Sequence, residues 1–163
     1  MLARFFRHLW SAYWQARRVL PVAACSRITE AIGRAEQGHA GEICFVVEAS
    51  LTPRQLLRQT SARERAVEVF AQMHVWDTAH NSGVLIYLLL ADRAVEIVAD
   101  RGLHPRGDTC WSEAAEHIRQ ACRAGDAAAG CIDAIVAVGD FLRREFPADG
   151  PNPDELPNSV RKL

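Results

Sequence analysis

The chain has 163 residues, of which 49% are hydrophobic and 24% are charged, values that suit one globular domain with a substantial core. The formal net charge is −1 at pH 7, which excludes an overall electric field that would attract nucleic acid or an anionic membrane. We therefore expect no nucleic-acid partner, and attraction to a membrane would require a local basic patch.

The number and spacing of the cysteines predict the compartment. No two of the five cysteines have the C-x-x-C spacing that zinc sites and redox dithiols use. An odd number of widely spaced cysteines indicates buried, reduced thiols, so we expect a reducing, cytoplasmic environment. The five are Cys25, Cys44, Cys110, Cys122 and Cys131.

Residues 1–20 form a basic, aromatic N-terminal segment that we expect to be helical. The segment has no apolar stretch of the ~20 residues needed to cross a bilayer, and it lacks the continuous apolar centre of a signal peptide. Two interpretations remain open. Its apolar side packs against the domain with the arginines in solvent, or it lies on a membrane surface or grips a partner helix, which would make the protein membrane-peripheral.

The next part of the chain predicts a helix followed by a strand. After Pro21, apolar residues recur at spacings of three and four from Ala24 to Ala35, which predicts a helix that ends near Gly38. Residues 43–47 are a short run rich in β-branched and aromatic side chains, and they predict the first strand.

A second helix and the central strand follow. Residues 49–60 predict a loop. Ser61 and Glu64 have the S-x-x-E spacing of a capping box, in which each side chain satisfies a free backbone N–H at the start of a helix. Residues 84–90 are the most apolar run of the chain, which is typical of a strand covered on both faces.

The last predicted elements are one strand and two helices. Residues 94–99 predict the third strand, and the short link at 91–93 requires it to run antiparallel to the second. Apolar residues with helical spacing then predict helices over residues 111–122 and 135–146.

This order of elements predicts an α/β fold: a three-layer α/β/α sandwich with a small, mixed, Rossmann-like central sheet and helices on both faces. Strands one and two should be parallel and joined by a right-handed crossover. We expect three regions, namely the basic segment 1–20, an α/β domain over 21–147, and an extended C-terminal tail over 148–163.

The predicted topology brings three oxygen-bearing side chains to one end of the sheet, and a loop that leaves from the same end could add a fourth. Asp77 and Asn81 precede strand two, and Asp100 follows strand three. Because these strands are antiparallel neighbours, the start of one lies beside the end of the other, and the loop at 101–108 adds Asp108. Carboxylate and amide oxygens suit Ca²⁺ or Mg²⁺. The alternative is that these residues are ordinary turn and cap positions.

The opposite end of the sheet carries Glu48 and Asp92, where open α/β sheets usually bind ligands. We consider it the weaker candidate, because no glycine-rich phosphate loop follows strand one. The sequence also has no G-x-S-x-G elbow and no P-loop. Any hydrolysis would therefore use a bound metal ion and water.

Three stretches together resemble the TPM domain family. They are GEICFVVEAS at 41–50, ARERAVEVFAQMHVWDTAHNSGVLIYLLLADRAVEIVADRGLH at 62–104, and the helical region at 111–146. The most specific part is NSGVLIYLLL followed by DR and VEIVADRGL. The resemblance covers residues 24–158.

The resemblance implies an α/β/α sandwich and a site for divalent cations, chiefly calcium, formed by acidic loop residues. Asp77 and Asp100 occupy the matching acidic positions, and Asn81 the matching polar one. A plant relative with acid phosphatase activity implies the same activity as an alternative. The chain looks like the shorter, soluble bacterial branch of the family, which implies a protein partner of the LemA-like membrane type.

Three functional hypotheses follow. The first is a non-catalytic, divalent-cation-binding accessory or adaptor domain that acts through a protein partner. The second is a metal-assisted acid phosphatase, in which Arg101 and Arg106 are the candidates to hold phosphate. The third is a peripheral membrane adaptor that uses residues 1–20.

Overall fold

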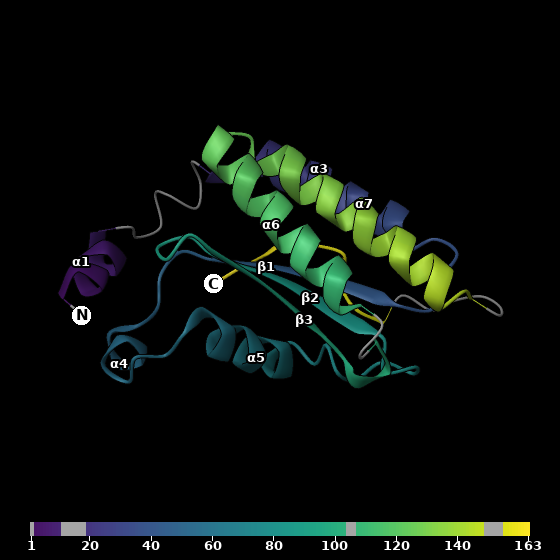
Figure 1. Ribbon diagram of the computed structural model, residues 1–163, viewed down its shortest axis with the longest axis horizontal. Coiled ribbons are helices and arrows are strands. Elements are labelled where there is room, and N and C mark those ends of the chain that lie inside the picture. Colours follow the sequence, from purple (N-terminus) through teal and green to yellow (C-terminus); the bar gives the residue numbers. More distant parts are fainter. Residues whose placement is uncertain (1, 11–18, 104–106, 149–154) are drawn as a thin grey trace.

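The computed structural model describes residues 2–10, 19–103, 107–148 and 155–163 (Figure 1). The helices are α1 Leu2–Trp10, α3 Val22–Ala35, α4 Pro53–Leu57, α5 Ala62–Gln72, α6 Asp108–Ala124 and α7 Ala127–Glu145, with a 3-10 turn at Arg101–Leu103. The strands are β1 Glu42–Glu48, β2 Gly83–Leu89, β3 Ala94–Ala99 and β4 Arg161–Lys162. None of the described helices combines the length and the apolar character needed to cross a membrane.

The four strands form one mixed sheet in the order β3-β2-β1-β4. Strands β1 and β2 are parallel, and β2 and β3 are antiparallel. Both orientations confirm the sequence prediction, as does β2, whose seven residues are all buried. The short link after β2 forces the chain to return along the same strand.

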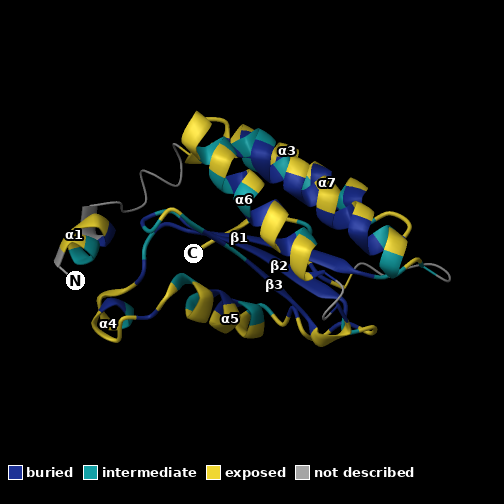
Figure 2. Cartoon of the chain, viewed as in Figure 1, coloured by how far each residue is buried: buried dark blue, intermediate teal, exposed yellow. Residues whose placement is uncertain are grey.

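Helices cover the two faces of the sheet, which confirms the three-layer sandwich. In Figure 1, α3, α6 and α7 lie over one face and α5 lies over the other. Successive strand residues point to opposite faces, so alternate residues of β1 and β2 enter two separate cores. Phe45 and Ile86 pack in the core below α3, α6 and α7, whereas Val46 and Tyr87 pack with α5. Figure 2 shows the buried sheet between helices whose outer faces are exposed.

Two elements were not expected from the sequence. β4 adds a fourth strand that is parallel to β1, with Val46 opposite Arg161, in the region predicted only as an extended tail. α4 lies within the predicted loop and begins with a second capping box, formed by Thr52 and Gln55. Both elements are too short for apolar periodicity to indicate them.

A buried ion pair lies between β1 and α5. The Glu48 carboxylate accepts hydrogen bonds from Arg65 Nε at 2.9 Å and Nη2 at 3.1 Å. It also accepts one from the Tyr87 hydroxyl at 2.6 Å. Burial, together with this bond to Glu48, raises the pKa of Tyr87, so the hydroxyl remains a donor. These bonds satisfy a charge that would otherwise be costly to bury.

We expect Glu48→Ala to lower the free energy of unfolding by about 3 kcal/mol, because Arg65 and Tyr87 lose their shared acceptor inside the protein. Glu68→Ala is the matched control, since Glu68 also binds Arg65 but is half exposed. Glu68→Ala should lower the free energy of unfolding by less than about 1 kcal/mol. Urea unfolding of both variants measures the difference, and equal losses would contradict a stabilising role for the buried pair.

Candidate functional site

Asp100 lies at the corner where β3 ends beside the start of β2. Its backbone N–H donates to Gly83 O at 2.9 Å, which extends the hydrogen bonding between β2 and β3 by one bond. The side chain is only 8% exposed. One carboxylate oxygen, Oδ1, accepts a hydrogen bond from the Arg101 backbone N–H at 2.6 Å. The other, Oδ2, is buried and has no hydrogen-bond partner among the described residues.

Asn81 occupies the same corner. Its backbone is in the left-handed region, with φ of 51°, a conformation that asparagine adopts more readily than most residues. Asn81 Oδ1 accepts from Arg101 Nη2 at 3.0 Å, and Asn81 O accepts from the Gly102 N–H at 3.1 Å. A Cβ atom at Gly102 would lie 2.5 Å from Asn81 O, so the close approach of the two loops requires glycine here.

The other two candidates are placed differently. Asp77 is exposed in the turn after α5, where its N–H donates to His74 O at 2.9 Å. Asp108 begins α6 and lines a separate hollow of about 300 Å³ between α6 and β3, together with Trp111. Within the described ranges, no three His, Cys, Asp or Glu side chains form a group that could hold a metal ion. The structure therefore joins Asn81 and Asp100 but does not preassemble all four candidates.

The corner contains a cation of its own, the Arg101 guanidinium. It donates to Asn81 through Nη2 and, at 3.2 Å, through Nε. A guanidinium in this position competes with a metal ion for the amide oxygen, and it also offers two donors to a phosphate oxygen. Arg106, the second candidate to hold phosphate, lies outside the described residues.

Burial makes four of the five thiols poor nucleophiles. All five cysteines are free. Burial raises the pKa of Cys44 to about 11 and also raises the pKa of Cys110, Cys122 and Cys131. Because the thiolate is the reactive form, these four side chains remain protonated and unreactive at neutral pH.

At the opposite end of the sheet, Asp92 attaches helix α1 to the domain. Its carboxylate binds Arg4 Nη2 at 2.7 Å, Arg7 Nη2 at 2.8 Å and His8 Nε2 at 3.0 Å. His8 Nδ1 accepts the Leu51 backbone N–H at 2.9 Å, which assigns the ring proton to Nε2. The tendency of burial to raise the Asp92 pKa is outweighed by these hydrogen bonds, which lower it to about 2.

This attachment differs from one of the two interpretations of the N-terminal segment. In that interpretation, its arginines lie in solvent while its apolar side packs on the domain. Arg4 instead faces the domain, where Nη2 also donates to Thr60 O at 2.7 Å, while Phe6 is largely exposed. The packing of the apolar side on the domain, the other half of that interpretation, is seen for Phe5, which packs against the core on the α5 side. Residues 11–18 of this segment lie outside the described residues.

The chain is similar to known proteins in sequence and in fold. The sequence profile of the TPM domain family matches residues 15–141. The NMR structure of the BA42 protein from the psychrophilic bacterium Bizionia argentinensis has a TM-score of 0.75 at 28% identity, covering 88% of this chain and 95% of that chain. The N-terminal domain of a protein from P. gingivalis, solved by solution NMR, has a TM-score of 0.60 at 20% identity, covering 84% and 90%; this likeness shows the fold alone. No curated protein matches the chain.

The depressed pKa of Asp92 predicts a pH dependence of stability. Its pKa of about 2 lies below the ordinary 3.8, so the contribution is complete above about pH 4 and is lost as the pH falls toward 2. We expect wild type to exceed Asp92→Asn by about 1–2 kcal/mol in unfolding free energy above this window, since Arg7 is half exposed and screened.

Urea unfolding at a series of pH values between 5 and 2 measures this difference. The gap between wild type and Asp92→Asn should narrow as the solution becomes more acidic. Asp133→Asn, which removes an exposed carboxylate of α7, is the control and should leave the pH profile unchanged. A gap that stays constant down to the acid end would contradict the assigned role of Asp92.

Proposed function

Since this chain belongs to the TPM domain family, we propose that it is a non-catalytic accessory domain that binds a divalent cation, Ca²⁺ or Mg²⁺, and acts through a protein partner. The observation that carries the proposal is the buried Asp100 Oδ2, which has no hydrogen-bond partner among the described residues. A desolvated carboxylate oxygen is costly unless a cation, a donor or water satisfies it.

The loops next to Asp100 offer further oxygen atoms for such an ion. Asn81 would contribute an amide oxygen from the adjoining loop, and Asp77 would add its exposed carboxylate from the turn that leads into that loop. Calcium accepts carboxylate, amide and water oxygens in flexible geometry, so the ion does not require a complete set of protein ligands. Asp108 is a secondary candidate, because it lines a different hollow.

A cation at this corner would tie together two loops that the domain presents at one end of the sheet. Asp100 and Asn81 belong to segments joined by the Gly102 N–H to Asn81 O hydrogen bond. Coordination of one ion by both loops would restrict the motion of the surface that they form. A preorganised surface binds a partner at a lower entropic cost. The partner that we propose is a membrane protein of the LemA-like type.

One observation favours phosphatase activity as the second candidate. The Arg101 guanidinium lies beside Asn81, one residue after Asp100, so it could hold a phosphate oxygen while a bound metal supplied an activated water. The arginine has opposite roles in the two proposals. It competes with the cation in the first and binds the substrate in the second.

The first test is a calcium and magnesium titration by calorimetry on wild type, Asp100→Asn and Asp77→Ala. We expect Asp100→Asn to weaken binding by about tenfold or more, because it removes a ligand charge while preserving side-chain shape. Asp77→Ala should weaken it less. Asp140→Asn, at an exposed position on α7, is the control and should bind like wild type. Folded wild type that takes up neither ion would refute the cation proposal.

Arg101→Gln distinguishes the two candidate functions. In the accessory-domain proposal, Arg101→Gln frees Asn81 Oδ1 from the guanidinium and removes a positive charge that repels the ion. Calcium should therefore bind several-fold more tightly. In the phosphatase proposal, metal-loaded wild type hydrolyses p-nitrophenyl phosphate and the variant loses most of this activity. Calorimetry and the hydrolysis assay on the same preparations decide between them, and metal-dependent hydrolysis by wild type would contradict a non-catalytic role.

A further inference from the structure

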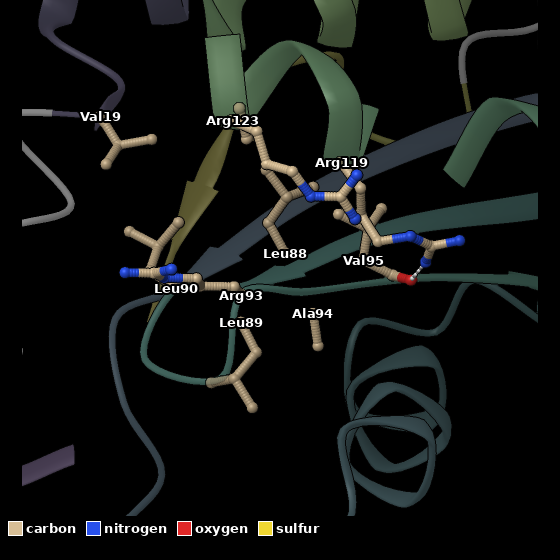
Figure 3. Close-up of a pocket in the computed structure, with 10 residues that line it drawn as sticks. Val19, Leu88, Leu89, Leu90, Arg93, Ala94, Val95, Arg119 and Arg123 are labelled. Atoms are coloured by element: carbon tan, nitrogen blue, oxygen red, sulfur yellow. Dashed lines mark hydrogen bonds between the residues drawn. The ribbon is translucent and has the colours of Figure 1, made fainter. Parts of the chain in front are cut away.

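A second cavity lies at the other end of the sheet from Asp100. It has a volume of about 690 Å³ and is formed by the end of β2, the link to β3 and the C-terminal half of α6 (Figure 3). This volume lies within the range of about 300–1,000 Å³ typical of small-molecule sites. The cavity shares no lining residue with the cation site.

The lining of this cavity divides into an apolar part and a cationic part. The apolar part includes Leu88, Leu90 and Val95, which lie on the α6 side of the sheet. The polar side chains are three arginines. Figure 3 shows Arg119 and Arg123 reaching down from α6, while Arg93 extends sideways from the link between the strands, with its guanidinium beside Leu90 and on the other side of the view.

The arginines carry more positive charge than their neighbours balance. Arg119 Nε binds Glu116 Oε2 at 2.8 Å, and Arg123 Nη1 lies 3.5 Å from the other oxygen of the same carboxylate. The Arg93 side chain makes no hydrogen bond or ion pair with another residue in the described part of the chain. The adjacent carboxylate, Asp92, is engaged by Arg4 and Arg7 of α1. Among the described residues, Glu116 thus pairs with two of the three guanidinium groups, and that of Arg93 has no carboxylate partner.

The backbone holds two of these arginines in place. Arg119 Nη1 donates to Val95 O at 3.0 Å, which attaches its guanidinium to the start of β3. Arg93 is in the left-handed region, with φ of 52°, and its N–H donates to Leu90 O at 3.1 Å within a tight turn. The fold therefore fixes the Arg119 guanidinium and the backbone of Arg93, whereas the side chains of Arg93 and Arg123 are exposed.

We propose that this cavity binds a small amphiphilic anion, a molecule with a carboxylate or phosphate head and an apolar body. The head would bind the arginines that border the cavity, either Arg119 and Arg123 of α6 or Arg93 of the link, and the body would lie on the leucines of β2 and the link. Guanidinium groups bind carboxylate and phosphate oxygens in pairs, and an apolar floor excludes fully hydrated anions as good ligands. The proposal does not depend on the cation site.

Calorimetric titration of the full chain with decanoate tests the proposal, with EDTA present so that calcium cannot contribute. Inorganic phosphate tests the head alone and decanol tests the apolar body alone. Decanoate should bind more tightly than either. Vesicles containing phosphatidylglycerol, compared with phosphatidylcholine, establish whether a bilayer supplies the same headgroup chemistry.

The decisive variant is Arg93→Gln combined with Arg123→Gln. Glutamine is compatible with the turn, because Gln59 of this chain adopts φ of 57°. The double variant should bind decanoate, or the anionic vesicles, about tenfold or more weakly. Arg34→Gln is the matched control, because Arg34 and Arg123 are both 67% exposed and Arg34 does not line the cavity.

The result is clear in either direction. Binding of decanoate or of anionic vesicles that is lost in the double variant and kept in Arg34→Gln supports the site and identifies the source of the anion. Binding of neither probe, including the case in which the chain itself fills the cavity, overturns the proposal. Equal binding by wild type and the double variant, or equal binding of decanol and decanoate, overturns it as well.

Discussion

The short link between β2 and β3 determines the arrangement on which the rest of the molecule depends. Only four residues separate the two strands, so β3 must return antiparallel along β2, the strand buried on both faces. The return places the end of β3 beside the start of β2, which creates the Asp100 corner. The link itself places Asp92 and Arg93 at the other end. Both candidate sites therefore follow from one turn and one buried strand.

Two buried acids of this sheet have opposite surroundings, and the contrast separates a structural group from a functional candidate. Glu48 is matched by Arg65 and Tyr87, so its charge is balanced and its role in stability is sufficient to explain it. Asp100 is buried to a similar degree, but Oδ2 has no partner among the described residues. Native proteins rarely leave such an atom without a hydrogen-bond donor, a water molecule or an ion. This asymmetry is the physical basis of the cation proposal.

Much of the fold could be predicted from the sequence, because apolar periodicity and turn chemistry are local. The bounds of β3, the orientations of the first three strands and the capping box of Ser61 all followed from patterns within a few residues. β4 did not, because two residues have no period and their pairing depends on the unpaired edge of β1. The attachment of α1 did not either, because Arg4 and Asp92 are 88 positions apart and no local pattern joins them.

The candidate site was predictable to the extent that it depends on strand ends. Asn81 and Asp100 meet because antiparallel strands bring them together, and topology was enough to expect it. Asp77 and Asp108 lie on segments whose course depends on side-chain contacts, such as the Glu155 carboxylate that accepts the Ala79 N–H at 3.1 Å. A prediction from strand order has no information about such contacts.

The arginine-lined cavity was missed for a related reason: its cationic side is built from α6 and the β2–β3 link, which are far apart in the sequence. The link also explains why the two ends of the sheet differ in charge. Asp92 and Arg93 are neighbours that would ordinarily neutralise each other, but α1 engages the carboxylate with two arginines and a histidine. The Arg93 side chain is therefore left without an ion-pair partner among the described residues, beside the cavity that it lines. In the two proposals, the helix that fastens the N-terminal segment would leave this end of the sheet able to bind an anion, while the Asp100 carboxylate would bind a cation at the other end.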